Sequence, residues 1–560
     1  MFKKTTLLLC CLLLINSTNT PAKQLLKQTQ STAHQALLRG SITPERAWWD
    51  LLHYQLSVNV DPKNKTLSGS NIVTYKVLTP AKRLQIDLQA PMTLKKAVQN
   101  KQILNIEQDG NAYFISTVTP QPIGSTQSLT LYFSGKPQEA KHAPWDGGIT
   151  WAKDDNGNDF IASSNQGIGA SIWWPNKDHG YDEPDNGVLI KVTVPEHLID
   201  VSNGRLIKTE HNKKQQTKTY YWQVTQPINN YGININIGDY VHFDQSYYGA
   251  HYTGEKGQLD MDYWVLRDDL SKAQQQFSDA KRTMDALEYW FGPYPFYQDS
   301  YKLVQAPYLG MEHQSSVTYG NKFKNGYLGK DRSQTGAGML FDFIIVHESG
   351  HEWFANNITA KDLADLWIHE AFTTYSESLF LEYHYDKATA FKYIRGQRLN
   401  IKNNAPIIGQ YNVNKEGSGD MYDKGSNMLH TIRQIINDDT KWRHILRGLS
   451  KSFYHQTVTS AQIENYMSEQ AGINLTKIFD QYLRDIRIPS FEYFIYDKTF
   501  KYRWGNVVAG FDMSLQITLN GNVKRITPTT KWQTITLDKD NSKLIVNANY
   551  YVSSLNLLGN

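Results

Sequence analysis

The sequence predicts an α+β protein of three successive domains: a large β-rich domain, a mainly helical domain and a small β-rich domain. Three observations lead to this fold class. Apolar and polar residues alternate through residues 46–245, helical spacing dominates residues 246–488, and short alternating stretches return over residues 489–560. The length of 560 residues fits several domains, because one domain commonly has about 100–200 residues.

The first 22 residues are typical of a cleaved export signal. Two lysines precede an apolar stretch at residues 6–15, which is too short to cross a hydrocarbon core of about 30 Å. We expect cleavage near Ala22 and export to the periplasm or the medium. A lipid anchor at Cys10 is the alternative. Residues 23–45 are polar with scattered leucines and are expected to form a leader segment.

Both cysteines of the chain, Cys10 and Cys11, lie inside this signal. If cleavage falls after Ala22, the mature protein has no cysteine and cannot form a disulfide. Any metal site in it has to be built from histidines and carboxylates.

The first large domain, residues 46–245, is predicted to be a β-sandwich-like or saddle-shaped domain. Residues 54–60 alternate apolar and polar side chains as a half-buried strand does, and a turn sequence follows at residues 61–64. Further strands are expected at residues 71–77, 83–88, 128–133, 188–194, 219–224 and 233–241.

The second domain, residues 246–488, is predicted to be mainly helical. A helical pattern over residues 270–292 ends at a Gly-Pro pair. Similar patterns follow at residues 334–356, 362–385, 421–438, 440–453 and 459–486. After Pro489, short alternating stretches such as residues 513–519 and 543–546 predict a small β-sandwich.

Charge and hydropathy exclude two classes of partner. The 58 basic and 54 acidic residues nearly balance, and no basic run is present, so we expect no nucleic-acid partner. No later stretch has the roughly 18 apolar residues of a membrane helix, so we expect no integral membrane segment in the mature chain.

The segment His347-Glu-Ser-Gly-His351 has the spacing of a zinc-binding helix. Residues four apart project from one helical face, so both imidazoles can reach one Zn²⁺. Glu348 lies beside the first ligand, where it can act as a general base on a metal-bound water. Glu370 follows in the next helical segment and is the predicted third ligand, which leaves one coordination position open.

These residues resemble those of the M1 family of zinc aminopeptidases, in which HExxH is followed by a glutamate after eighteen residues. The resemblance extends from about Trp48 to residue 560 and implies a thermolysin-like catalytic domain and one Zn²⁺ per chain. Because only about 70 residues follow Pro489, it also implies a short form without the C-terminal helical solenoid of larger members.

Further motifs carry the resemblance. Leu309-Gly-Met-Glu-His313 is similar to the GAMEN motif of the family, so Gly310, Met311 and Glu312 are expected to bind substrate, with Glu312 on the α-amino group. The family usually has Gly-Ala and Asn where this chain has Leu309-Gly310 and His313. Met421-Tyr-Asp-Lys-Gly425 resembles the YxKG segment, which implies that Tyr422 donates a hydrogen bond to the oxyanion.

A loop of the β domain also resembles its counterpart in the family. By this analogy, Gln166 would help Glu312 to hold the substrate amine. The second zinc helix departs slightly from the family pattern, since His369 precedes the ligand Glu370 where asparagine is usual.

The predicted activity is zinc-dependent hydrolysis of the N-terminal bond of peptides that have a free amino terminus. Three alternatives stay open: a zinc endopeptidase, an epoxide hydrolase of the leukotriene type on the same scaffold, and an inactive peptide-binding module. The preferred N-terminal residue and the oligomeric state are not predicted.

Overall fold

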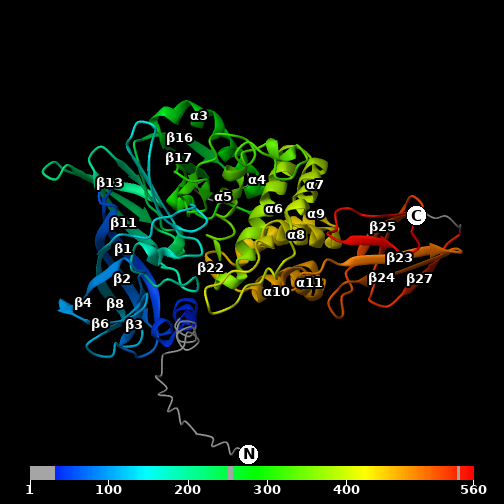
Figure 1. The fold of residues 1–560 in the computed structure, drawn as a ribbon, viewed down its shortest axis with the longest axis horizontal. Coiled ribbons are helices and arrows are strands. Elements are labelled where there is room, and N and C mark those ends of the chain that lie inside the picture. Colours follow the sequence, from blue (N-terminus) through cyan, green and yellow to red (C-terminus); the bar gives the residue numbers. More distant parts are fainter. Residues whose placement is uncertain (1–31, 250–256, 539–542, 560) are drawn as a thin grey trace, which may run out of the picture.

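The computed structural model describes residues 32–249, 257–538 and 543–559. Its chain runs through three consecutive parts, with β-sheets at one end, helices in the middle and a smaller pair of sheets at the other end (Figure 1). This arrangement confirms the predicted α+β fold class. The predicted signal peptide at residues 1–22 lies outside the described residues.

The N-terminal part begins with short helices that pack on the first sheets. A helix covers residues 32–40, and α2 follows at Pro44–Ala47. Arg46 is fully buried in this segment, and its Nη2 donates to Asp87 Oδ2 at 2.6 Å. This buried, paired charge fixes the segment to the sheet that contains Asp87.

An eight-stranded sheet forms most of the N-terminal part. Its central strand β1 pairs antiparallel with β2 and parallel with β11, and alternate residues such as Leu56 and Val58 are buried. In spatial order the strands are β13 (Arg205–Asn212), β14 (Thr217–Val224), β11 (Val188–Pro195), β1 (Trp49–Asp61), β2 (Thr66–Val77), β8 (Thr126–Gly135), β4 (Thr93–Gln99) and β5 (Gln102–Ile103).

Two smaller sheets complete this part. One consists of β3 (Arg83–Asp87), β7 (Ala112–Ser116) and β6 (Asn105–Asp109). The other consists of β12 (Ile199–Val201), β15 (Asn236–Gly238), β10 (Asp159–Ser164) and β9 (Gly148–Lys153). The loop that follows β10 carries Gln166 toward the central part.

The central part opens with a five-stranded sheet. Its order is β16 (Tyr240–Tyr248), β17 (Gln258–Leu266), β18 (Tyr301–Gln305), β20 (Val317–Tyr319) and β19 (Gly310–Met311). The predicted domain boundary at 245 falls inside β16, which pairs with β17 along its whole length. The chain passes from the last N-terminal sheet to this sheet between β15 and β16, which only one residue, Asp239, separates in the sequence.

Helices make up the rest of the central part. They are α3 (Leu270–Gln276), α4 (Ser278–Phe291), α5 (Phe343–Gly350), α6 (Trp367–His384), α7 (Lys387–Gly396), α8 (Asp423–Ile436), α9 (Asp439–Ser452), α10 (Ser460–Ala471) and α11 (Thr476–Leu483). A short parallel pair, β21 (Ile358–Ala360) with β22 (Gln456–Val458), joins segments far apart in the sequence.

Short 3₁₀ turns connect these elements. They are η1 (Ala170–Ile172), η2 (Asn230–Gly232), η3 (Arg267–Asp269), η4 (Tyr297–Asp299), η5 (Ala337–Met339), η6 (Leu363–Asp365), η7 (Gln397–Asn400) and η8 (Gly419–Met421).

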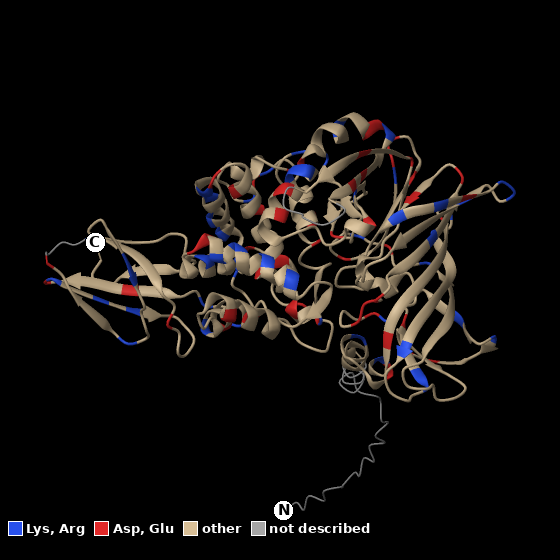
Figure 2. Ribbon diagram, turned by 180° about the vertical axis from the view of Figure 1, so that it is seen from behind, with Lys and Arg blue, Asp and Glu red and all other residues tan. Residues whose placement is uncertain are grey.

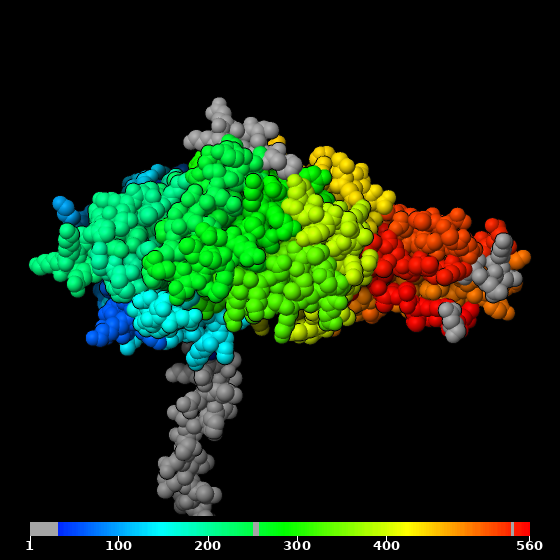
Figure 3. All heavy atoms as spheres, turned by 90° about the horizontal axis from the view of Figure 1, so that it is seen from above, coloured from blue at the N-terminus to red at the C-terminus, as the bar shows by residue number. Residues whose placement is uncertain are grey.

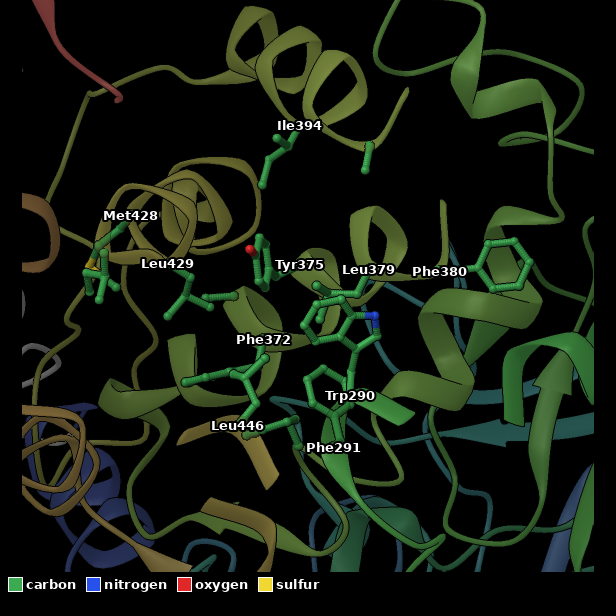
Figure 4. Packing of buried hydrophobic residues seen from close by; sticks show 14 of the residues in the cluster. Trp290, Phe291, Phe372, Tyr375, Leu379, Phe380, Ile394, Met428, Leu429 and Leu446 are labelled. Atoms are coloured by element: carbon green, nitrogen blue, oxygen red, sulfur yellow. The ribbon is translucent and has the colours of Figure 1, made fainter. Parts of the chain in front are cut away.

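Helix α6 is the axis of the helical core. Its apolar side chains meet those of α4, α7, α8 and α9, as Figure 4 shows for Trp290, Phe291, Phe372, Tyr375, Leu379, Phe380, Ile394, Met428, Leu429 and Leu446. Because α6 is packed by neighbouring helices, the side chains at its N-terminal end are held in fixed positions.

The C-terminal part consists of two small sheets. One contains β27 (Gln533–Thr536), β24 (Thr499–Gly505), β23 (Ser490–Tyr496) and β29 (Ser553–Asn556), and the other contains β26 (Asn522–Ile526), β25 (Leu515–Leu519) and β28 (Leu544–Val546). Seen from above, this part extends beyond the helices (Figure 3). It is fixed there by contacts such as the hydrogen bond that Tyr482 donates to the Tyr551 carbonyl at 2.6 Å.

Charges are mixed along the whole molecule. Blue and red segments alternate through the ribbon of all three parts (Figure 2). None of the helices in the described ranges combines the length and the apolar character that a membrane crossing needs.

Candidate metal centre and active site

Helix α5 presents His347 from its last turn and His351 from the residue that directly follows it. Asp342 caps the start of the helix, because its side chain accepts from the backbone N–H groups of Ile344 and Ile345. His347 and His351 lie one turn apart, and their ring centroids are 5.0 Å from each other. Both side chains are buried, at 6% and 2% exposure. The predicted histidine pair is therefore formed inside the protein.

Glu370, in the first turn of α6, completes the group. Its Oε2 lies 3.4 Å from His351 Nε2 and 3.8 Å from His347 Nε2. One ligand atom from each of the three residues lies within 4.8 Å of the other two. The helices approach closely at Gly350, where an added Cβ would lie 2.8 Å from Ser376 Oγ of α6.

Hydrogen bonds on the far side of each imidazole orient the two rings. His347 Nδ1 donates to Glu377 Oε1 at 2.8 Å, and His351 Nδ1 donates to the Phe354 carbonyl at 3.0 Å. Thr373 Oγ1 also lies 3.1 Å from His351 Nδ1. Since Nδ1 of each ring donates to these acceptors, Nε2 is the atom of each ring that faces Glu370 and is available to a metal.

The group fits a bound cation. Burial opposes the imidazolium form of His347, yet the neighbouring carboxylates of Glu370 and Glu377 outweigh it and raise the pKa of His347 to about 10. Glu370 Oε2 is buried, and no described residue makes a hydrogen bond to it. A site that attracts positive charge and offers two imidazole nitrogens and one carboxylate oxygen fits Zn²⁺.

Two further carboxylates lie beside the metal group. Glu348 follows the first histidine on α5, and Glu312 follows strand β19; they are 8% and 2% exposed. A carboxylate oxygen of each and a ring nitrogen of His351 lie within 4.8 Å of one another. Burial raises the pKa of Glu348 to about 7, and the neighbouring Glu312 adds to the shift, while His347 lowers it.

The β domain contributes Gln166 to the same group. Its Nε2 donates to Glu312 Oε1 at 2.7 Å and to Glu370 Oε1 at 2.9 Å. Tyr231, also from the β domain, donates to Glu312 Oε1 at 3.2 Å. The structure thus brings Gln166 and Glu312 together, and it links both to Glu370, the predicted third metal ligand.

Gly310 and Met311 form β19, the edge strand next to α5. An added Cβ on Gly310 would lie 2.7 Å from Ile344 Cγ2 and 3.1 Å from Glu348 Oε1. A glycine at this position lets the strand approach the helix that carries Glu348.

Tyr422 immediately precedes α8, and its ring lies 6.1 Å from the His347 ring in a stacked orientation. Burial, together with the charges of Glu370 and Glu312, raises the pKa of Tyr422 well above its usual value. The phenol is therefore neutral and able to donate a hydrogen bond.

A cleft with a volume of about 900 Å³ joins these residues. All of the predicted site residues line it: Gln166, Gly310, Met311, Glu312, His347, Glu348, His351, Glu370 and Tyr422. The two histidines that depart from the family motifs have other contacts. His313 Nδ1 lies 2.9 Å from Asn234 Nδ2, and His369 Nε2 accepts from the Ala360 N–H at 2.8 Å.

Sequence reasoning missed two contacts of this site. Glu377, which orients His347, follows Glu370 by seven residues and so shares its helical face; this spacing is a signal that can find it. Tyr231, which contacts Glu312, stands in a β-domain turn, and nothing in its local sequence distinguishes it from the other tyrosines.

Comparison with known proteins identifies the family of this chain. Residues 276–482 match the family model described as Peptidase family M1 domain, and residues 51–231 match Peptidase M1 N-terminal domain. The two matches together cover more than half of the chain. The chain belongs to peptidase family M1, as its motifs predict.

Individual relatives are distant. Endoplasmic reticulum aminopeptidase 1 of Rattus norvegicus is 19% identical over 72% of this chain and 44% of its own length. Probable aminopeptidase 1 of Sulfurisphaera tokodaii is 22% identical over 75% of this chain and 52% of its own length. The chain thus spans about half of these curated relatives.

Solved structures show the same fold. A mutant M1 zinc metallopeptidase from Deinococcus radiodurans superposes with a TM-score of 0.66 and 20% identity, covering 80% of this chain and 97% of that one. The donor set of His347, His351 and Glu370 and the family of zinc metallopeptidases agree on Zn²⁺ as the cofactor.

Proposed function

We propose that this protein is an aminopeptidase that uses Zn²⁺ to hydrolyse the N-terminal bond of peptides with a free amino terminus. One observation carries the proposal: Glu312, bridged by Gln166 to the ligand Glu370, places a buried carboxylate beside the metal group. A carboxylate there pairs with the ammonium group of a substrate and so selects the terminal bond.

Gln166 has an orientation that suits this role. Carboxylates can only accept hydrogen bonds, so the atom that faces Glu312 and Glu370 is the amide nitrogen. The Oε1 atom of Gln166 is then the one that can accept from the substrate ammonium. Together with Glu312, it would hold the amine on the side of Glu370.

The chemical step then follows from the other side chains. His347, His351 and Glu370 would hold the Zn²⁺, which when bound would supply Lewis-acid activation of the scissile carbonyl and of the attacking water. Glu348 takes the proton of that water and passes it to the leaving amine. The neutral Tyr422 phenol donates a hydrogen bond to the oxyanion as its charge develops.

Two properties of relatives support peptides as the substrate class. The curated relatives are named aminopeptidases, and one Deinococcus radiodurans structure is described as bound to a Tyr-Ser-Ala substrate.

Hydrolysis of matched substrates tests the proposal. We expect aminoacyl fluorogenic amides and free peptides to be cleaved by the zinc-loaded protein, and their N-acetylated forms to resist. The variant Glu312→Gln should reduce the preference for free over N-acetylated peptides, because the substrate ammonium loses its charged partner. Equal cleavage of blocked peptides would instead identify an endopeptidase, and binding without cleavage would identify an inactive module. Turnover of an epoxide, with no cleavage of any peptide, would identify an epoxide hydrolase on the same scaffold.

We also propose that the protein is exported to the periplasm or the medium. The proposal rests on the sequence of the first 22 residues, which has a positive start, a short apolar stretch and small residues near Ala22. N-terminal sequencing of the protein recovered from each cell fraction tests it. A cytoplasmic protein that retains these residues would contradict it.

A further inference from the structure

Arg332 stands in the wall of the cleft, between β20 and α5. Its guanidinium carbon lies 5.3 Å from the centre of the Phe343 ring. That ring stacks on the His347 ring at a centroid distance of 5.2 Å and an interplanar angle of 14°. Arg332, Phe343 and the metal ligand His347 therefore form a continuous stack that leads away from the metal group.

The loop that carries Arg332 has a fixed conformation. The carboxylate of Asp331 accepts hydrogen bonds from the backbone N–H groups of Ser333, Thr335 and Gly336. Arg332 Nη2 donates to Asp423 Oδ2 at 3.1 Å. Its side chain is nevertheless 28% exposed, and it lines the cleft. A guanidinium has five N–H donors, so one ion pair leaves donors that a ligand can use.

The position of Arg332 defines which part of a substrate it can meet. The amine anchor, Glu312 with Gln166, lies beside His351 and Glu370. Arg332 lies on the side of His347, beyond Phe343. A peptide whose amino terminus is held at Glu312 must pass the metal group before it reaches Arg332. The guanidinium therefore faces the residues that follow the scissile bond.

The second basic side chain of the cleft, Lys415, lies near the amine-binding end. Among the described residues that line the cleft, the lysines and arginines are Arg332 and Lys415. Lys415 belongs to the loop whose Asn414 donates to the Gly167 carbonyl at 3.0 Å, next to Gln166. It thus lies near the amine end, and Arg332 is the cation available to the leaving product.

We propose that Arg332 binds the C-terminal carboxylate of short peptides, so that tripeptides with a free carboxylate are the preferred substrates. This specificity rests on the proposed aminopeptidase function. An extended chain advances about 3.3–3.6 Å per residue, so two residues beyond the scissile bond cover most of the distance from His347 across Phe343. A planar guanidinium fits a carboxylate with two parallel hydrogen bonds.

The test compares a tripeptide with its C-terminal amide on the zinc-loaded protein. We expect the free acid to have a KM lower by about tenfold at a similar kcat, because a charge-assisted pair strengthens binding without entering the chemical step. Arg332→Gln should bring the two KM values together, and Arg332→Lys should keep part of the difference. Rising salt should weaken the preference for the acid.

Lys415→Gln is the matched control, and it should preserve the preference for the free acid. Thermal unfolding of each variant shows whether loss of the ion pair with Asp423 has disturbed the fold. The comparison of acid and amide on the unmutated protein tests the inference even if a variant fails to fold. Equal KM values for acid and amide on that protein would overturn the inference while leaving the aminopeptidase function intact. A preference lost in Lys415→Gln but kept in Arg332→Gln would overturn it too. Absence of cleavage of both peptides would overturn the proposed function instead.

Discussion

Glu348 and Glu370 are buried carboxylates on adjacent helices with opposite proton affinities. Burial opposes the ionisation of both. The charge of His351 and the closeness of both imidazoles still hold the pKa of Glu370 well below its usual range, whereas burial raises the pKa of Glu348 to about 7. Glu370 is therefore a permanent anion suited to a cation, and Glu348 is a group that can gain and lose a proton near neutral pH.

This difference predicts the effect of Glu348→Gln. The amide keeps the size of the side chain but cannot accept the proton of water. We expect kcat to fall by about 10²–10⁴-fold while the zinc content stays at one ion per chain. Steady-state hydrolysis and metal analysis of the same sample measure both. Glu416→Gln, which removes an exposed carboxylate of the same cleft, is the control and should retain activity.

The proton affinity of Glu348 also predicts the pH profile. A general base must be ionised, so activity rises as pH rises through its pKa. The positive charge of a bound Zn²⁺ lowers this pKa from about 7, because it stabilises the carboxylate. We expect the acidic limb of kcat/KM to have its midpoint below pH 7. A profile whose acidic limb has its midpoint above pH 8 would contradict the assignment.

At the scale of elements, helical spacing found the helices better than it found their ends. The pattern over residues 334–356 contains the short α5 and the 3₁₀ turn η5 in place of one long helix, because Asp342 caps α5 and the residues before it form turns around Asp331. The pattern over residues 459–486 is split where Gly472 takes a left-handed conformation with φ of 66°. Both breaks depend on hydrogen bonds and backbone angles that apolar periodicity does not record.

Helix α7 at residues 387–396 was not predicted. Asp386 caps it by accepting from the Thr389 N–H, and such a cap is a readable start signal that a search for apolar periodicity overlooks.

The contact between β19 and α5 predicts that Gly310→Ala is harmful. The family motif usually has alanine at this position, yet in this chain the new Cβ would lie 2.7 Å from Ile344 Cγ2 and 3.1 Å from Glu348 Oε1. Displacement of the base by a fraction of an ångström to one ångström should lower kcat/KM by about 10–100-fold. The overpacking should also cost about 1–3 kcal/mol of stability.

A second substitution separates this clash from other effects. Ile344→Ala removes the Cγ2 atom that the new methyl group would meet. The double variant Gly310→Ala/Ile344→Ala should therefore be more active than Gly310→Ala alone, which a double-mutant cycle can measure. Full activity of Gly310→Ala would show that β19 can move away from α5 without loss of activity, so that the close approach of the two elements is not required.

At the scale of the whole molecule, the active site joins parts that are distant in the chain. Gln166 and Glu370 are 204 positions apart, and they belong to the β-rich N-terminal part and to the central part, respectively. Local sequence patterns predict the metal helix because its ligands are four residues apart. They cannot predict which β-domain loop reaches it, and only the motif resemblance pointed to Gln166. Tyr231 has no such motif, so its contact with Glu312 was found only in the structure.

This junction predicts that Gln166 acts by organising two carboxylates. Its amide donates to Glu312 and Glu370 at once, and without it these like charges face each other unscreened. We expect Gln166→Ala to raise KM for free peptides by about tenfold, since hydrogen bonds to charged groups contribute about 1.5–3 kcal/mol. Gln166→Glu should raise KM further, because it adds a third negative charge beside Glu312 and Glu370.

Asn414→Ala distinguishes this electrostatic role from simple attachment of the loop. Asn414 crosses the same junction, and its Nδ2 donates to the Gly167 carbonyl at 3.0 Å, one residue from Gln166, and not to a carboxylate. If Gln166 only fastens the loop, both alanine variants should raise KM equally. If it balances Glu312 against Glu370, Asn414→Ala should change KM little, and only the Gln166 variants should lose the preference for free over N-acetylated peptides. The second outcome follows from the geometry, because a hydrogen bond to a backbone carbonyl does not alter the charge that the substrate ammonium meets.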